Sequence, residues 1–340
     1  MFRKLYLYFL LLFSALSFAQ IGGKSAYQFL NMVTSPRQAA LGGKNITIYD
    51  QDVNQGIYNP AAINDEMDSH LSLNYGNYYG EVAYGTAAYA YTYDRHLQTF
   101  HAGVTYVNYG NFEGRDENGN QTADFTGSDI ALSLGYAYNV PSTNLYLGAN
   151  VKFISSTLES YNSFGGAIDL AAIYKDETND VNWAFVARNI GTQFSTYAGT
   201  KEQLPLELML GVSQQLSHVP LRWHITLDNL QQWNISFSNP VRAVGSFDGG
   251  ETPEQISFFN NALRHLVLGA ELFPQNKFNL RLGYNFRRGE ELKVEELRNF
   301  SGLSVGFGLR MKRIKFEYSY SRYTLAANTS LFGLTINFQE

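Results

Sequence analysis

The chain has 340 residues, a formal net charge of −5 and no cysteine. Without cysteine there is no disulfide framework and no lipid-modified cysteine. The acidic balance, with no basic cluster, argues against a nucleic-acid-binding protein. Charged residues make up only 16% of the chain and aromatic residues 15%, a balance unlike that of an ordinary soluble domain.

The first residues have the pattern of a secretory signal. Arg3 and Lys4 precede an apolar run over residues 5–18, and Ala19 follows as a small residue suited to cleavage. The alternative is an uncleaved anchor helix, but roughly 14 apolar residues fall short of the about 20 that span a bilayer. We therefore expect residues 1–19 to be a signal peptide and the mature chain to begin at Gln20.

Alternating hydrophobicity is the main signal in the rest of the chain. In the clearest segment, Ile314, Phe316 and Tyr318 form one face of an expected strand. The intervening Lys315 and Glu317 form the other face. Strands with one aromatic, apolar face and one polar face are typical of a wall between lipid and water. Candidate strands are 69–77, 81–94, 97–109, 127–139, 143–156, 163–175, 181–190, 205–216, 219–228, 264–273, 277–288, 300–311, 313–323 and 330–338.

The lengths of the connections favour a membrane barrel over a soluble all-β protein. Connections after even-numbered strands are short, and the long ones follow odd-numbered strands, as in outer-membrane barrels with short periplasmic turns and longer outer loops. The first, third and last outer connections are short and are exceptions to this rule. We therefore predict an all-β protein, a transmembrane antiparallel barrel of about 14 strands over residues 69–338, located in the cell outer membrane and in contact with its lipid.

The longest connection, residues 229–263, is expected to be an outer loop with internal structure. Thr252 and Pro253 fit the start of a short helix, and the alternation of Trp233 and Ile235 predicts that the preceding strand continues beyond the membrane. A mobile loop is the alternative. The aromatic residues of this loop are the candidate partner-binding residues: Trp233, Phe237, Phe258 and Phe259.

Residues 20–68 lack the pattern of membrane strands. Pro36 fits the first position of a helix, and Gly42 and Gly43 fit its end. Because a lumen of 14 strands is wide enough to need a plug unless it is an open pore, we expect this stretch to be a plug, or hatch, in the lumen. A loose periplasmic tail is the alternative. The residues that define the plug motif are Pro36, Gly42, Gly43, Asn59, Pro60 and Ala61.

The order of these motifs resembles the PorV/PorQ family of type IX secretion outer-membrane proteins of Bacteroidetes, which is related in fold to the FadL fatty-acid transporters. The resemblance rests on the run from Ser35 to Gly43, on Asp50 and Asp52, on Asn59 to Ala61, and on the strands that follow. It implies a non-enzymatic component of the secretion and attachment machinery that anchors a surface partner resembling PorZ through its outer loops.

The chain carries no recognisable catalytic constellation, and we expect no enzyme, cofactor or metal site. Asp116, Asn118 and Asn120 imitate the start of a calcium loop, but Gln121 stands where the motif requires glycine. Asp169 and Arg188 are read as charged groups lining the lumen. The second candidate function is FadL-like transport of a small hydrophobic ligand past the plug. The polar lumen faces of the predicted strands favour the anchoring role over transport.

Overall fold

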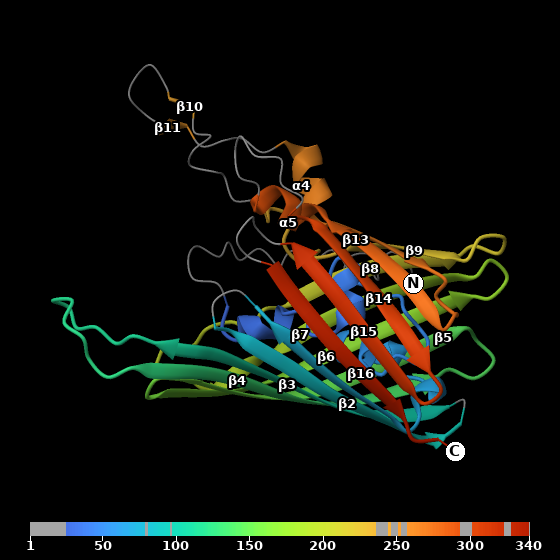
Figure 1. Ribbon diagram of the computed structural model, residues 1–340, viewed down its shortest axis with the longest axis horizontal. Coiled ribbons are helices and arrows are strands. Elements are labelled where there is room, and N and C mark those ends of the chain that lie inside the picture. The colour runs from blue at the N-terminus through green and yellow to red at the C-terminus, as the bar shows by residue number, and fades with distance from the viewer. Residues whose placement is uncertain are drawn as a thin grey trace, which may run out of the picture.

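The computed structural model describes residues 25–78, 81–95, 97–235, 244–245, 251–252, 257–292, 301–322 and 328–339. Within them the chain forms a closed barrel in which every strand pairs with antiparallel neighbours (Figure 1). The barrel closes because the first strand pairs with the last, placing His70 opposite Asn337 and Asn77 opposite Ser330. The prediction of an antiparallel barrel of 14 strands is confirmed.

Every strand expected from the sequence has a counterpart in the wall, with its ends displaced by a few residues. The wall strands are β1 (His70–Asn77), β2 (Ala83–Asp94), β3 (Gln98–Phe112), β4 (Phe125–Asn139), β5 (Leu145–Leu158), β6 (Tyr161–Asp176), β7 (Val181–Ser195), β8 (Glu207–Gln215), β9 (Leu221–Leu227), β12 (Leu266–Leu272), β13 (Phe278–Asn285), β14 (Leu303–Met311), β15 (Ile314–Arg322) and β16 (Asn328–Asn337).

The wall is apolar outside and polar inside. On β4, Ile130 and Leu134 are exposed on the outer surface, whereas Asp129 and Ser133 are buried on the inner face. A soluble protein with this arrangement would leave its large apolar side chains in water. Lipid around the barrel removes that cost, so the alternation places β4 and its neighbours across a membrane.

The segment before β1, residues 25–67, lies inside the barrel and is called the N-terminal segment below (Figure 1). It packs against strands from both sides of the wall: α2 against β13 to β16, and η2 against β4 to β6. Its elements are η1 (Gln28–Asn31), α2 (Pro36–Ala40), α3 (Gln55–Tyr58), η2 (Pro60–Ala62) and η3 (Asp65–Met67). The expected signal peptide, residues 1–19, lies outside the described residues.

The connection between β9 and β12 differs from its predicted structure. Its helix is α4 (Phe258–Arg264), capped by Ser257, whose hydroxyl accepts from the Asn260 amide. Thr252 belongs instead to β11 (Glu251–Thr252), which pairs with β10 (Val244–Gly245). The predicted extension of β9 is also wrong, because the strand ends at Leu227 and Trp233 is not in a strand.

The strand predicted over 277–288 ends early, because β13 stops at Asn285. The Asn285 side chain accepts from the amide of Arg288 and so caps α5 (Phe286–Glu291). An asparagine side chain that satisfies a free amide favours a helix start over a continued strand. Among the described residues no helix is long and apolar enough to cross a membrane.

Candidate functional site

Helix α2 of the N-terminal segment begins and ends where the sequence predicts. Ser35 is extended, Pro36 occupies the first turn of α2, and the chain leaves the helix through Gly42 and Gly43 at φ +90° and +99°. These backbone angles are in the left-handed region, which glycine adopts without a Cβ clash. The Gly43 amide donates to the Gln38 carbonyl at 2.8 Å and completes the turn.

Glycines on the inner face of the wall let the N-terminal segment approach the strands closely. A Cβ on Gly283 of β13 would stand 2.2 Å from the Gly42 nitrogen, and one on Gly148 of β5 would stand 2.2 Å from the carbonyl carbon of Pro60. Backbone therefore packs directly on backbone on two sides of the lumen. A side chain at either position would require the segment to move.

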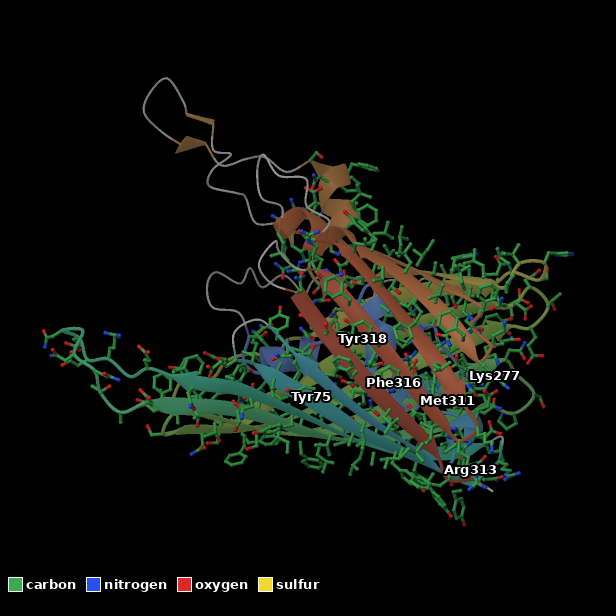
Figure 2. All side chains as sticks on the ribbon, in the orientation of Figure 1. Tyr75, Lys277, Met311, Arg313, Phe316 and Tyr318 are labelled. Atoms are coloured by element: carbon green, nitrogen blue, oxygen red, sulfur yellow. The ribbon has the colours of Figure 1, made fainter. Side chains whose placement is uncertain are left out.

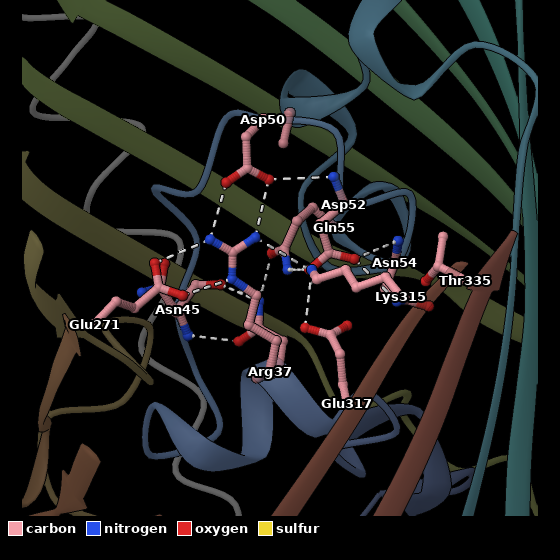
Figure 3. A network of polar contacts seen from close by, with 12 residues as sticks. Arg37, Asn45, Asp50, Asp52, Asn54, Gln55, Glu271, Lys315, Glu317 and Thr335 are labelled. Atoms are coloured by element: carbon pink, nitrogen blue, oxygen red, sulfur yellow. Dashed lines mark hydrogen bonds and ion pairs between the residues drawn. The ribbon is translucent and has the colours of Figure 1, made fainter. Parts of the chain in front are cut away.

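Arg37 is the centre of the ion pairs that hold the segment (Figure 3). Its guanidinium donates to both carboxylate oxygens of Glu271 on β12, at 2.7 and 2.9 Å. It also donates to both oxygens of Asp50, at 2.9 Å each, and to Asp52 at 3.4 Å. Arg37 is only 2% exposed, and Glu271 is fully buried. We call these four residues the Arg37 cluster.

Further ion pairs extend the Arg37 cluster into the wall. Arg281 on β13 donates to Glu271 at 3.1 Å and lies 2.7 Å from Glu317 on β15, which also pairs with Lys315 at 2.9 Å. Arg222 on β9 lies 3.3 Å from Asp50. Carboxylates buried in this way are tolerated because cations compensate their charge.

The charges of the cluster fix its protonation. Burial alone would raise the pKa of Asp50, but the Arg37 guanidinium outweighs burial and holds it well below its ordinary value. Burial likewise opposes the charge of Arg37, yet Asp50 and Glu271 keep the pKa of the guanidinium above its usual value. Removing one partner from such a buried pair typically costs about 3–5 kcal/mol.

The second part of the sequence motif stabilises the segment internally. The Asn59 side chain accepts from the Ala61 amide at 2.9 Å and donates to the Ile46 carbonyl at 2.6 Å. Pro60 opens η2 directly after this cap. Asn59 therefore links η2 to the irregular stretch around Ile46 within the segment.

A second set of contacts joins the segment to β8 and to β7, close to a bulge in β7. Lys44 pairs with Glu207 of β8 at 2.6 Å, and Arg188 of β7 donates to the Leu30 carbonyl at 3.1 Å. The bulge follows from Asn189, which has φ +59°. Its amide donates to Asp169 at 2.8 Å.

Asp169 and Arg188 both line the lumen, as expected from the sequence, but each has another ion-pair partner. Asp169 pairs with Lys152 at 2.6 Å, whereas Arg188 lies 3.5 Å from Glu207. The register of β6 and β7 shifts between Ile168 and Leu170. The bulge therefore changes which residues of the two strands face one another.

A small cavity of about 20 Å³ separates the segment from this part of the wall. Phe29, Leu30 and Ile57 line its segment side, and Lys152 and Arg188 line its wall side. Among the described residues Arg188 Nε has no hydrogen-bond partner. The cavity is large enough for about one water, with apolar groups on one side and cations on the other.

The aromatic residues predicted to bind a partner form a surface cluster on the loop before β12. Trp233 is 50% exposed, Phe258 74% and Phe259 71%. The rings of Trp233 and Phe258 have centroids 4.9 Å apart, and the Asn261 side chain donates to the Trp233 carbonyl. We call Trp233, Phe258 and Phe259 the aromatic cluster. Phe237, the fourth candidate, lies outside the described residues.

Residues 116–120, which imitate the start of a calcium loop, form a turn that is closed by hydrogen bonds among its own residues. Asp116 accepts from the amides of Asn118 and Asn120 and from the Asn120 side chain, at 2.8 to 2.9 Å. These bonds occupy both oxygens of the carboxylate. In the described part of the chain, no three His, Asp or Glu side chains are arranged to hold a metal ion.

Comparison with known proteins shows the fold. No family model and no curated protein matches this sequence. The Ralstonia pickettii toluene transporter TbuX and a deltaS2 mutant of the TodX monoaromatic hydrocarbon channel each align with TM-score 0.54 and 15% identity, over 91% of this chain and 100% of theirs. A Pseudomonas aeruginosa FadL homologue aligns with TM-score 0.52 and 11% identity, over 90% of this chain and 98% of its own. The chain is therefore an outer-membrane barrel with a FadL-like fold.

Proposed function

We propose that this protein carries small hydrophobic or amphipathic molecules across the outer membrane, and that the N-terminal segment is the plug they must displace. The observation behind the proposal is the boundary at the cavity beside the β7 bulge, where apolar side chains of the segment meet Lys152 and Arg188 of the wall. The cavity holds only about one water, so passage of a larger molecule requires the segment to move. That lining suits a molecule with an apolar body and an acidic or polar head. The solved proteins of similar fold that are named as a toluene transporter and a hydrocarbon channel support this function.

Uptake of a fluorescent long-chain fatty acid by cells producing the protein tests transport. Met32→Trp, which fills the cavity from the segment side, should reduce uptake severalfold. Leu134→Trp on the exposed outer face of β4 is the control and should leave uptake unchanged. Equal uptake by cells with and without the protein would contradict transport.

A second function is favoured by the aromatic cluster. Large exposed aromatics that are held in place usually mark a binding surface, and Trp233 is held by Asn261 and by His265, whose ring nitrogen lies 3.0 Å from its carbonyl. Together with the PorV/PorQ-like motif, this surface supports a PorQ-like component of type IX secretion that anchors a PorZ-like surface protein.

Replacing residues 234–262 with a short Gly-Ser turn tests the anchoring role. Surface loops tolerate such changes, so the barrel should still fold and shift on gels when heated. The surface partner should be lost from the purified complex, and secreted cargo should detach from the cell. If the partner still co-purifies, the aromatic cluster is not its binding site, and the loop around residues 196–204 is the next candidate. The two functions separate cleanly, because this replacement should leave fatty-acid uptake intact.

A further inference from the structure

Two neighbouring short turns place three cations side by side at one end of the barrel. Lys277 precedes β13, and Lys312 and Arg313 form the turn between β14 and β15. The turns are adjacent because β13 and β14 are paired, with Phe278 opposite Leu309 and the Arg310 amide donating to the Lys277 carbonyl at 2.7 Å. All three side chains are exposed. We call Lys277, Lys312 and Arg313 the basic rim.

The charge of the basic rim is not compensated by the described residues. None of them forms an ion pair with Lys277, Lys312 or Arg313, whereas the deeper Lys315 pairs with Glu317 at 2.9 Å. A cavity of about 40 Å³ opens behind the rim; Lys312, Arg313 and Arg310 line it, and Asp52 of the N-terminal segment lines its inner side. The rim is therefore a positive patch with a polar recess behind it.

Other turns at this end of the barrel lack this charge. The turn between β6 and β7 is acidic, with Asp176, Glu177 and Asp180. In the turn between β2 and β3, Arg95 is the one cation among the described residues. The positive charge is thus concentrated on the β13–β15 side.

The basic rim lies directly against the lipid-facing surface. Phe278, Met311 and Ile314 are next to the three cations in the chain and are 46%, 55% and 43% exposed. Figure 2 shows Lys277, Met311 and Arg313 at one end of the wall, with Phe316 and Tyr318 further along it. This is the end with the short turns, which faces the periplasm in outer-membrane barrels.

We propose that the basic rim binds the phosphate of an anionic phospholipid in the inner leaflet of the outer membrane. The acyl chains would lie along Phe278, Met311 and Ile314, while the headgroup reaches the cations at the membrane boundary. Cations at this depth attract anionic lipids. An anionic phospholipid matches both observations, since it offers an acyl chain for the apolar strip and a phosphate for the rim. A free phosphate ion or an acidic peptide uses only the charge.

Binding of phosphatidylglycerol to the full-length protein tests the proposal. The delipidated protein in neutral detergent is titrated with phosphatidylglycerol or phosphatidylcholine, and bound lipid is counted by native mass spectrometry. The triple variant Lys277→Gln, Lys312→Gln, Arg313→Gln should lose affinity for phosphatidylglycerol on the order of a hundredfold at low salt, at about fivefold per cation. Binding of phosphatidylcholine should not change.

The matched control removes the same charge elsewhere: Arg95→Gln, Arg115→Gln and Lys201→Gln, which replace exposed cations outside the rim. It should bind phosphatidylglycerol as the unaltered protein does. Equal loss in both triple variants, or no loss in either, would overturn the proposal. Displacement of the lipid by millimolar inorganic phosphate or by an acidic peptide would also overturn it, because the site would then serve a soluble anion. If the rim triple variant does not fold, Arg313→Gln alone should still lose about fivefold.

Discussion

Arg37 and Glu271 stand 234 positions apart in the chain, yet two hydrogen bonds of 2.7 and 2.9 Å join the guanidinium to the carboxylate. Arg37 belongs to α2 of the N-terminal segment, whereas Glu271 belongs to β12 of the wall. The pair therefore holds the N-terminal segment to the wall of the barrel. Since both side chains are buried, removing one would leave the other charge without compensation.

Arg37→Ala should release the N-terminal segment without unfolding the barrel. Removing one partner of a buried ion pair costs about 3–5 kcal/mol. That cost should weaken the attachment of the segment to the wall, because the wall strands keep their hydrogen bonds to one another. Planar-bilayer recordings should show a higher conductance, and amide exchange over residues 36–58 should accelerate. Arg115→Ala, which removes an exposed pair with Glu113, is the control. Unchanged conductance and exchange in Arg37→Ala would show that the segment is held by other contacts.

Acid should weaken the seating of the segment through Asp50. The pKa of this carboxyl is held well below its ordinary value by Arg37, so the charged form contributes stability above the pKa of the released segment, about 3.9. That contribution is lost as pH falls through the lower pKa of the seated state. Conductance should stay constant from pH 7 to about 4 and rise below. Asp50→Asn should conduct more at neutral pH and lose this step; an identical acid profile in both proteins would rule out Asp50 as the cause.

Gly283→Ala should displace the segment from the wall. The added Cβ would stand 2.2 Å from the Gly42 nitrogen, a distance that only backbone movement relieves. We expect a folded barrel, judged by its gel shift on heating, with increased protease sensitivity near Gly42. Ala102→Val, on the exposed face of β3, adds bulk toward lipid and should have no such effect. A protease-resistant Gly283→Ala protein would mean that the wall, not the segment, adjusts.

Serine replacements of Trp233, Phe258 and Phe259 should impair partner binding more than stability. These side chains are largely exposed, and surface substitutions usually change stability by less than about 0.5 kcal/mol each. Thermal unfolding of the triple variant should therefore stay close to that of the unaltered protein, while co-purification of the surface partner falls at least tenfold. Phe194→Ser, at another exposed aromatic, is the control and should retain the partner.

The barrel could be predicted almost completely from the sequence because its wall depends on a local pattern. On strands such as β4 and β15, each residue faces either lipid or lumen, and the alternation is readable without knowing the neighbouring strands. The pattern fails where a side chain caps the backbone. Phe286 and Arg287 continue the alternation of β13, yet the Asn285 cap converts that stretch into α5.

The partners of the buried charges could not be predicted in the same way. Asp50, Asp52 and Arg37 were visible as parts of a motif, but Glu271 reads as one more polar residue on a strand. Its role depends on how the N-terminal segment packs against β12, which brings Arg37 within hydrogen-bond distance of Glu271. The sequence does show polar residues at inward positions of β12, β13 and β15. They indicate that the lumen is filled, but they do not show which residue of the segment pairs with which residue of the wall.

The packing of α2 against the wall has a consequence for the order of assembly. Helix α2 is synthesised before any wall strand, but it packs on β13 to β16, the last strands of the chain, and Arg37 finds Glu271 on β12. Helix α2 therefore has no binding site until β12 to β16 are in place. Closure of the barrel and packing of α2 are then coupled events, and a chain without β15 and β16 would lack part of the surface on which α2 packs.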